Sequence, residues 1–402
     1  MNIGVFTHCV ANNCGANLQA LSTGLWLRNN GYTPVFIRWD EYLKIEEKIM
    51  NPLQSELHQS FLSRYGFEVT EPCVTDEDFR KVLKKYDIEN IIVGSDCVLT
   101  YSKPIIPYVL TRRGFKKVIV PSDFEFPNPF WLPFIQDDDK IKRYMISASS
   151  GSTRISSIKG AVKEQMKELL SKYDYISVRD TNAKKMINYL FGEEKGVTIT
   201  PDPVFGLDDD SLDLPTKSDI CKKYNLPNNY LVVSFFSHYW PSQDWINSLC
   251  EEASKHNLSC VGVPTPAGGK QPTHHIDIQL PLDPIDWYCL IKYSSGYIGN
   301  KMHPLIVSLH NVVPFFSYNI HGRFYLRHRF QSIKSSKEHD LLKRFGLEGF
   351  EVAQLHSSKI SAKYVVEKLL DFDYEDRKKI ADIMKKEHSQ MMKSIKTIID
   401  AR

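Results

Sequence analysis

Short apolar runs alternate with segments of helical periodicity along the first half of the chain. An apolar run between turn residues predicts a buried strand, and apolar residues three or four positions apart predict one face of a helix. We expect strands at residues 3–7, 34–37, 88–93, 144–148, 175–178 and 197–200. We expect helices around 18–26 and at 76–86, 158–172 and 181–191. Such alternation is typical of a mostly parallel, doubly wound sheet.

The same alternation starts again after residues 207–228, which are rich in Asp, Pro, Lys and Asn and which we interpret as a linker. Strands are expected at 230–236, 259–263, 297–299 and 312–318, and helices at 245–256, 284–292 and 302–310. Residues 374–402 predict one long charged helix, because isoleucine and methionine recur there at helical spacing.

These elements predict an α/β fold with two doubly wound, Rossmann-like domains and a long C-terminal helix. The N-terminal domain would span residues 1–210 and the C-terminal domain 225–370. The arrangement resembles the two-lobed, glycosyltransferase-B-like architecture, and this resemblance implies that the helix at 374–402 packs back on the N-terminal domain. Ligands of such folds bind outside the carboxyl ends of the strands.

One aromatic segment interrupts the alternation. Residues 121–134 carry four prolines among aromatic side chains, so the segment cannot form a regular helix. The aromatic residues are Phe124, Phe126, Phe130, Trp131 and Phe134. Two interpretations remain open: an irregular insertion packed into the core, or an aromatic loop that stacks on sugar rings or enters a membrane interface.

Composition narrows the class of protein. The 402 residues are 25% charged with a net charge of +3, which argues against a general nucleic-acid binder. The eight cysteines form no C-x-x-C pair, so a structural zinc site is not expected and free thiols in a reducing compartment are. No stretch approaches the ~20 apolar residues of a membrane span. We therefore expect a cytoplasmic protein, with peripheral contact at the inner face of the membrane left open.

Polar side chains follow several predicted strands at the point where each strand ends. The carboxyl ends of parallel strands share one edge of a sheet, so these residues are candidates for one site. They are Asn13, Gly15, Asn17, Ser95, Asp96, Ser149, Arg179, Asn300, Lys301 and His303.

The segment around residues 296–310 carries the clearest signal. A short strand ends at Gly299, and Lys301 and His303 precede an apolar run with helical spacing, with Pro304 tolerated in the first turn. Backbone N–H groups at a helix N-terminus already favour an anion. A cation and an imidazole at that place suit a phosphate or carboxylate substrate.

Six short motifs occur in a characteristic order along residues 1–320. They are Asn13-Cys-Gly-Ala-Asn-Leu-Gln-Ala20, Val93-Gly-Ser-Asp96, Ser147-Ala-Ser-Ser-Gly151, Ser177-Val-Arg-Asp180, Pro201-Asp-Pro203 and Lys301-Met-His303. In this order the chain resembles the polysaccharide pyruvyl transferase family. The resemblance implies transfer of pyruvate from phosphoenolpyruvate, the co-substrate, to two hydroxyls of a sugar in a cell-surface polysaccharide precursor. The product would be a cyclic ketal, with no other cofactor needed.

The resemblance also implies an acceptor-binding N-terminal domain and a donor-binding C-terminal domain. The acceptor would be a sugar or a lipid-linked glycan. The chain departs from the family where Cys97-Val-Leu replaces an aromatic-rich continuation, and where Lys301 replaces an arginine. His321, with Arg323 nearby, stands in the place of a lysine that some members carry. Lysine binds phosphate as a point charge and lacks the bidentate fork of arginine.

Transfer of pyruvate requires residues that bind the two anionic groups of the donor and residues that transfer protons. Arg179 suits the donor's carboxylate or phosphate through its planar fork, and Lys301 with the helix N-terminus suits the other anion. His303 titrates near neutrality and is the candidate acid, while Asp96 is the candidate base. No step requires a metal. The other substrate-binding candidates are Asn13, Gly15, Asn17, Ser95, Ser149, Asn300, His321 and Arg323.

Two alternatives remain open at this point. A nucleotide-sugar glycosyltransferase would use the same cleft, would need nucleobase contacts in the second domain, and would not need Arg179. A binding or scaffold relative would keep the fold without the chemistry, since fold alone does not fix function.

Overall fold

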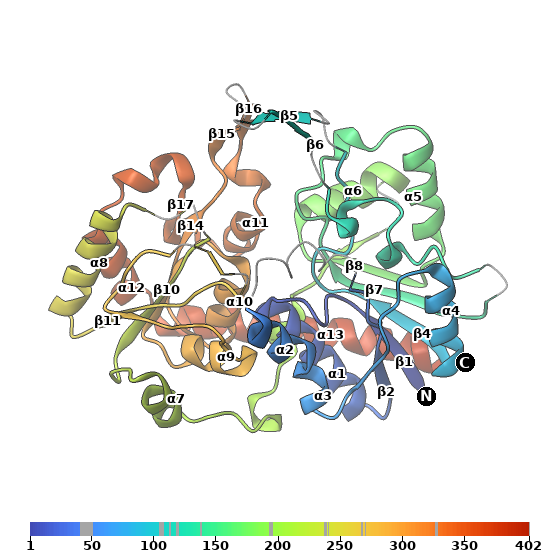
Figure 1. Ribbon diagram of the computed structural model, residues 1–402, viewed down its shortest axis with the longest axis horizontal. Coiled ribbons are helices and arrows are strands. Elements are labelled where there is room, and N and C mark those ends of the chain that lie inside the picture. The colour runs from blue at the N-terminus through green and yellow to red at the C-terminus, as the bar shows by residue number, and fades with distance from the viewer. Residues whose placement is uncertain are drawn as a thin grey trace.

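The computed structural model describes residues 1–40, 51–103, 108–111, 114–117, 120–136, 139–192, 196–236, 239, 241–266, 268–269, 271–325 and 329–401. Two parallel sheets lie in two lobes, with the N-terminal lobe on the right of Figure 1 and the C-terminal lobe on the left. Helices cover the sheets, so the predicted two-lobed α/β fold is confirmed.

The first sheet has the strand order β3-β2-β1-β4-β7-β8-β9. Its strands are β1 (Asn2–Phe6), β2 (Thr33–Phe36), β3 (Glu68–Val69), β4 (Ile88–Val93), β7 (Lys142–Ala148), β8 (Tyr175–Val178) and β9 (Thr198–Ile199). The connecting helices are α1 (Cys14–Asn29), α2 (Pro52–Gln59), α3 (Phe61–Arg64), α4 (Asp76–Lys85), α5 (Ala161–Ser171) and α6 (Thr181–Phe191). In the centre of the sheet Val5 lies opposite Phe36 on one side and Ile92 on the other.

The second sheet has the order β12-β11-β10-β13-β14-β17. Its strands are β10 (Tyr230–Ser234), β11 (Ser259–Gly262), β12 (Ile276–Asp277), β13 (Gly296–Gly299), β14 (Phe315–Asn319) and β17 (Glu351–Ala353). Its helices are α7 (Lys217–Tyr224), α8 (Gln243–Lys255), α9 (Pro284–Lys292), α10 (Met302–His310), α11 (Lys337–Arg344) and α12 (Ala362–Asp371).

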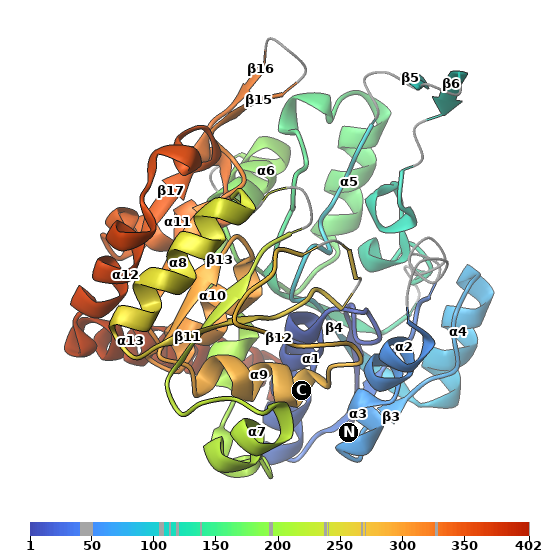
Figure 2. The same ribbon diagram turned by 60° about the vertical axis from the view of Figure 1, so that its left-hand side comes forward.

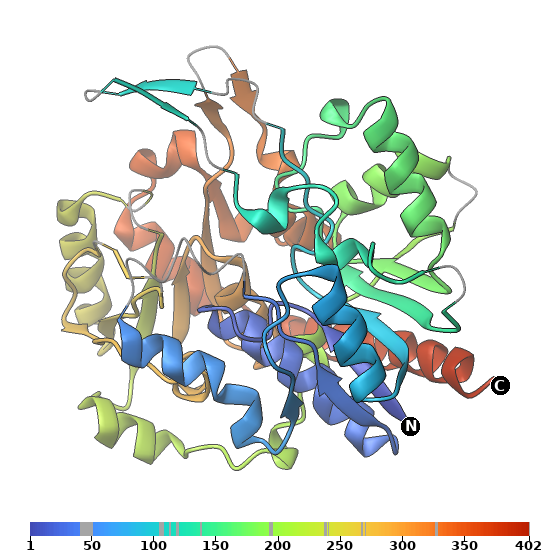
Figure 3. The same ribbon diagram turned by 45° about the vertical axis from the view of Figure 1, so that its right-hand side comes forward.

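Each lobe also carries a small two-stranded antiparallel sheet. The pair β5 (Tyr108–Thr111) and β6 (Gly114–Lys117) belongs to the N-terminal lobe. The pair β15 (Arg323–Tyr325) and β16 (Arg329–Gln331) belongs to the C-terminal lobe. Both lie at the top of the molecule in Figures 1, 2 and 3. The sequence pattern predicted neither pair.

The last helix, α13 (Tyr374–Asp400), runs across both lobes behind α1 in the view of Figure 1. It contacts α10 of the C-terminal lobe and the turn at Pro203–Gly206. In the N-terminal lobe the Ser147 hydroxyl donates to the Met391 sulfur at 3.4 Å, and Tyr32 hydrogen-bonds Asp400. The apolar stripe of α13 is buried, including Met391, Met392 and Ile395. The helix therefore ties the lobes together.

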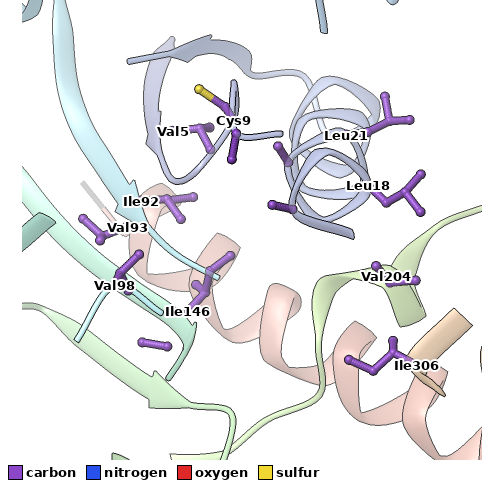
Figure 4. Close-up of a cluster of buried hydrophobic side chains, with 14 of the residues drawn as sticks. Val5, Cys9, Leu18, Leu21, Ile92, Val93, Val98, Ile146, Val204 and Ile306 are labelled. Atoms are coloured by element: carbon purple, nitrogen blue, oxygen red, sulfur yellow. The ribbon is translucent and has the colours of Figure 1, made fainter. Parts of the chain in front are cut away.

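One buried cluster extends from the first sheet into the second lobe. Figure 4 shows Leu18 and Leu21 on the face of α1 that is turned away from Val5 of β1, and Val204 beside Ile306 of α10; all belong to one buried cluster. All five side chains are at most 1% exposed. A shared apolar core of this kind holds the ends of α1 and α10 in fixed relation, which positions the residues described below.

The aromatic segment at residues 121–134 packs into the core of the N-terminal lobe. Phe130 and Phe134 are fully buried. The Phe134 ring stacks on Phe79 with a centroid distance of 4.4 Å, and Phe130 lies 4.7 Å from Phe6. The first interpretation, a packed irregular insertion, is therefore confirmed for these residues.

The segment at residues 207–228 is more ordered than a linker. It contains α7, whose first turn is fixed by a reciprocal capping box between Thr216 and Asp219. The helix packs on α9. The high polarity of the segment reflects an amphipathic surface helix, and its capping signal was overlooked.

Candidate functional site

Three strand ends meet where the two lobes face each other. Residues 94–96 follow β4, Arg179 follows β8, and residues 300–303 follow β13. Helix α10 contacts the turn at Pro203–Gly206, and α11 contacts α6. Asp96, Arg179 and His303 thereby come close together, from three separate parts of the sequence.

Arg179 forms the fixed centre of this site. One terminal nitrogen lies 2.6 Å from Asp202 Oδ2 and the other lies 3.0 Å from Asp96 Oδ1. Its side chain is 3% exposed. Burial lowers the pKa of the guanidinium, but Asp202 and Asp96 outweigh it, so the group stays charged. Asp202 also accepts a hydrogen bond from Gln19 of α1 at 2.5 Å.

The backbone before Asp96 explains the Gly-Ser-Asp sequence. Gly94 has φ +112°, and a Cβ there would lie 2.3 Å from the carbonyl oxygen of Ile146, so only glycine fits. Asp96 itself has φ 77°, a conformation that non-glycine residues rarely adopt. The Ser149 amide donates to the Asp96 carbonyl at 2.8 Å and holds it to the end of β7. Such strain is concentrated at functional sites.

Asp96 is held as a carboxylate. Burial alone would raise its pKa, but the neighbouring His303, Arg179 and Lys337 more than offset this and hold the pKa well below its usual range. Its second oxygen faces His303, whose Nε2 lies 4.0 Å from Oδ2. That distance is too long for a hydrogen bond but short enough for electrostatic attraction.

His303 lies in the first turn of α10 with its ring between the lobes. The side chain is 12% exposed, and Nε2 has no hydrogen-bond partner among the described residues. Burial lowers the pKa of the imidazole, although Asp96 and Asp202 act in the opposite direction. The N-terminus of α1 presses on the ring, because a Cβ on Gly15 would lie 2.1 Å from His303 Cγ. Glycine at that position is required for this contact.

Lys301 precedes α10 and is half-buried beside the second sheet. Its ammonium donates to the Ser234 hydroxyl at 2.8 Å and lies 5.5 Å from the centre of the Phe236 ring. Burial lowers the pKa of the amine to about 7, and Cys14 acts weakly in the opposite direction. In the absence of ligand, therefore, Lys301 is only partly charged near neutral pH.

The other predicted residues of the N-terminal lobe make structural contacts. Asn13 accepts the Gly15 amide at 3.1 Å and caps α1, and Asn17 donates to the Cys9 carbonyl at 3.0 Å. The Ser95 hydroxyl donates to the Ser147 carbonyl at 3.0 Å, and the Ser149 hydroxyl donates to Asp180 at 2.5 Å. These bonds build the strand ends; binding of a substrate by these residues stays a prediction.

In the C-terminal lobe Asn300 anchors the chain after β10. It accepts the Phe236 amide at 2.7 Å and donates to the Tyr239 carbonyl at 3.0 Å. The Arg323 guanidinium lies 4.6 Å from the centre of the Tyr239 ring. His321 lies 2.9 Å from the Gln331 side chain, and burial lowers its pKa. These residues stay predicted binding residues.

Sequence reasoning missed two charged groups of the site. Asp202 was part of a motif without a role, yet it is the second carboxylate on Arg179. Lys337 begins α11, and its charge acts on Asp96, Cys97, Arg179 and His303. Ser336 followed by an acidic first turn is a helix-start signal, but nothing in the sequence places that helix beside Arg179.

The motif order and this geometry agree with a comparison of families. Residues 13–322 match the family described as polysaccharide pyruvyl transferase. The chain belongs to the polysaccharide pyruvyl transferase family. The family assigns it to the transferases. No curated protein matches the sequence.

Solved structures show the same fold at low identity. UDP-GlcNAc 2-epimerase from Neisseria meningitidis, bound to UDP-GlcNAc, has a TM-score of 0.56 and 12% identity, covering 99% of this chain and 100% of the other. The S. aureus MnaA–UDP structure has a TM-score of 0.51 and 11% identity, covering 100% and 97%. At such identity the likeness concerns the fold alone. No helix in the described part of the chain is long and apolar enough to cross a membrane.

Proposed function

We propose that this protein transfers pyruvate from phosphoenolpyruvate to two hydroxyls of a sugar in a cell-surface polysaccharide precursor, forming a cyclic ketal. The observation that carries the proposal is His303. Its buried Nε2 has no partner among the described residues and faces the ionised Asp96 at 4.0 Å. An imidazole in that position is available to a substrate as a proton donor.

The reaction can be written with His303 as the acid. The imidazolium gives its proton to the methylene carbon of the donor, and the resulting oxocarbenium carbon is attacked by one sugar hydroxyl. The carbon–oxygen bond to phosphate then breaks, and the second hydroxyl attacks the same carbon. One hydroxyl proton replaces the proton that His303 gave, and the other leaves with inorganic phosphate, so atoms and charge balance.

Asp96 is better suited to holding His303 than to accepting a proton. Arg179 lies on one of its oxygens and helps to keep its pKa low, which makes it a weak base. Its other oxygen faces the imidazole and stabilises the protonated form. The role of Asp96 as base to the sugar hydroxyl stays a prediction.

The donor supplies the charge that the site lacks. Phosphoenolpyruvate carries a phosphate and a carboxylate, and its negative charge would raise the pKa values of Lys301 and His303. Binding of the donor would therefore increase the protonated fraction of both groups. Arg179 is already paired with two carboxylates, so it would contribute mainly by orienting Asp96. No cofactor beyond phosphoenolpyruvate is part of this proposal.

The acceptor is proposed to be a sugar or a lipid-linked glycan intermediate. A lipid-linked acceptor would place the enzyme at the inner face of the membrane, as a peripheral protein. The departures from the family at Cys97, Lys301 and His321 concern the donor side of the site. The identity of the donor should therefore be tested before that of the acceptor.

The direct test is product analysis. The protein is incubated with phosphoenolpyruvate and a panel of glycan intermediates, and products are followed by mass spectrometry together with release of inorganic phosphate. We expect an acceptor to gain one pyruvate with loss of water. Transfer from a nucleotide sugar, with none from phosphoenolpyruvate, would favour a glycosyltransferase. Binding of a glycan without either reaction would favour the inactive relative.

A further inference from the structure

The first turn of α11 is fastened to the loop that carries Arg179. Asp340 accepts hydrogen bonds from the Thr181 amide and the Thr181 hydroxyl, both at 2.6 Å. Thr181 is the first residue of α6 and follows Arg179 by two positions. This contact joins the two lobes directly beside the site, where α11 contacts α6.

Lys337 lies three residues before Asp340 on the same helix. Residues at i and i+3 share one face of a helix, so Lys337 and Asp340 both face α6 and the Arg179 loop. The charge of Lys337 interacts with those of Asp96, Cys97 and Arg179. It also lowers the pKa of His303.

Lys337 differs from the neighbouring cations in having no partner. No hydrogen bond or ion pair joins its ammonium to any residue that the structure describes, and its side chain is half-buried. Arg179 is engaged by Asp96 and Asp202, and Lys301 donates to Ser234. A buried or half-buried cation without a partner is costly unless a ligand supplies the counter-charge.

Lys337 also stays charged. Burial lowers the pKa of the amine, but Cys97, Glu338 and Asp96 outweigh it and raise the pKa above its ordinary value. Burial raises the pKa of the Cys97 thiol to about 11, so Cys97 is neutral near pH 7. The carboxylates of Glu338 and Asp96 also raise the pKa of Lys337, and the charge of Arg179 lowers it.

A charge count shows why the site needs this group. Arg179 with Asp96 and Asp202 carries one net negative charge, and the buried His303 and Lys301 are neutral or partly charged without ligand. A donor that bears a phosphate and a carboxylate would be repelled by such a site. Of the cations whose charge acts on His303 and Asp96, Lys337 is the one whose ammonium makes no hydrogen bond or ion pair within the described residues.

We propose that Lys337 is a donor-binding residue whose ammonium holds the phosphate of phosphoenolpyruvate next to His303. This inference rests on the proposed function and adds a residue from α11 that supplies the phosphate contact. Lysine suits phosphate as a flexible point charge with three donors. The lysine thereby contributes the fixed positive charge that His321 and the partly charged Lys301 do not provide.

The test compares three variants in the full-length protein. Lys337→Met removes the charge and keeps the length of the side chain, Lys337→Arg keeps the charge, and Lys334→Met is the control. Lys334 lies three residues earlier and is exposed. The dissociation constant for phosphoenolpyruvate is measured by calorimetric titration, and the melting temperature is measured without ligand.

We expect Lys337→Met to weaken binding of phosphoenolpyruvate by about tenfold or more, since a charge-assisted contact is lost. Lys337→Arg should retain most of the affinity and Lys334→Met all of it. The melting temperature of Lys337→Met should not fall, because the ammonium has no partner to lose. The melting temperature therefore distinguishes a residue that binds the donor from one that stabilises the fold.

The outcomes separate the inference from the proposed function. If wild-type protein binds phosphoenolpyruvate and Lys337→Met binds it equally well, the inference is wrong and the proposed function stands. If Lys337→Met loses affinity but also melts at a lower temperature, and Lys337→Arg does not restore binding, the residue is structural and the inference is again wrong. If wild-type protein binds no phosphoenolpyruvate at all, both fall.

Discussion

The two lobes differ in how they hold the charged groups that they contribute to the site between them. On the N-terminal side, Arg179 is buried between Asp96 and Asp202, and its charge is matched before any ligand arrives. On the C-terminal side, Lys301 and His303 have pKa values lowered by burial, and Lys337 has no partner among the described residues. The N-terminal face is therefore fixed in charge, whereas on the C-terminal face Lys301 and His303 can gain charge when a ligand binds and Lys337 stays charged throughout.

The difference follows from how each group is buried. A buried cation that meets carboxylates keeps its charge, whereas a buried amine or imidazole without such a partner tends to lose its proton. In this site the paired cation Arg179 keeps Asp96 in a fixed orientation. The imidazole of His303, whose Nε2 has no hydrogen-bond partner among the described residues, can gain or lose the proton that the reaction needs. The following changes would break or sharpen this contrast.

The largest effect is expected from His303→Asn. If the ring delivers the proton, its loss should lower the rate of phosphate release in the presence of acceptor by ~10²–10⁴. The melting temperature should stay close to that of the wild type, because Nε2 has no hydrogen-bond partner within the described residues. Steady-state kinetics and thermal unfolding measure the two quantities.

A matched control lies in the same helix. His310 ends α10, its pKa is lowered to about 3 by burial, and it packs 6.1 Å from the ring of Phe205. His310→Asn should leave the rate nearly unchanged. A loss of rate below tenfold in His303→Asn, or an equal loss in both variants, would rule out the acid role.

The next largest effect is expected on the stability of the protein, when the ion pairs of Arg179 on the N-terminal face are broken. Arg179→Met leaves Asp96 and Asp202 buried without their cation, so the free energy of unfolding should fall by about 3–5 kcal/mol. Urea unfolding at pH 7 measures this. Adding Asp202→Asn to the same chain removes one uncompensated charge and should recover part of the loss. A loss below about 1 kcal/mol in the single variant would show that the pairing is unimportant.

Much of the fold was predictable because hydrophobic periodicity reports local burial. Strands such as β10 and β13 are apolar over most of their length in a parallel sheet, and the long helix α13 shows its apolar stripe directly. The short strands β3 and β12 have two residues each and give no period to detect. The helix α7 was hidden by its polar surface, and residues 41–50 lie outside the described part of the chain.

The site was predictable only in part. The rule that strand ends share an edge brought out Asp96, Arg179 and His303, which the structure places together. The state of each group was not predictable, because pKa depends on burial and on partners distant in sequence, such as Asp202 on Arg179. Lys337 was missed for the same reason: its place depends on the contact between Thr181 and Asp340.

On the C-terminal face, the lowered pKa of Lys301 predicts that the stability of the protein depends on pH. The pKa of its amine is about 7 in the folded protein and 10.5 as an ordinary value, so above pH 7 the unfolded chain binds more protons. Stability of the wild type, relative to Lys301→Met, should therefore rise between pH 7 and pH 10. The slope is at most about 1.4 kcal/mol per pH unit.

Urea unfolding of both proteins at pH 6, 7, 8 and 9 measures this difference. Below pH 7 the folded protein also protonates Lys301, so the slope should vanish there. A difference that is independent of pH would mean that the amine keeps its ordinary pKa in the folded protein. The two faces would then not differ in the way described above.

The smallest expected effect is the uptake of protons when the donor binds. At pH 8 the negative charge of phosphoenolpyruvate should raise the pKa values of Lys301 and His303, so the complex should take up at most about two protons from the buffer, one on each group. Calorimetric titration in two buffers of different ionisation enthalpy measures the number. Arg179 contributes none, since its guanidinium is charged before and after binding. Lys301→Met should reduce the uptake, while Lys334→Met, an exposed lysine outside the site, should not. Equal uptake in wild type and Lys301→Met would show that the charge on the C-terminal face is already fixed before the donor arrives.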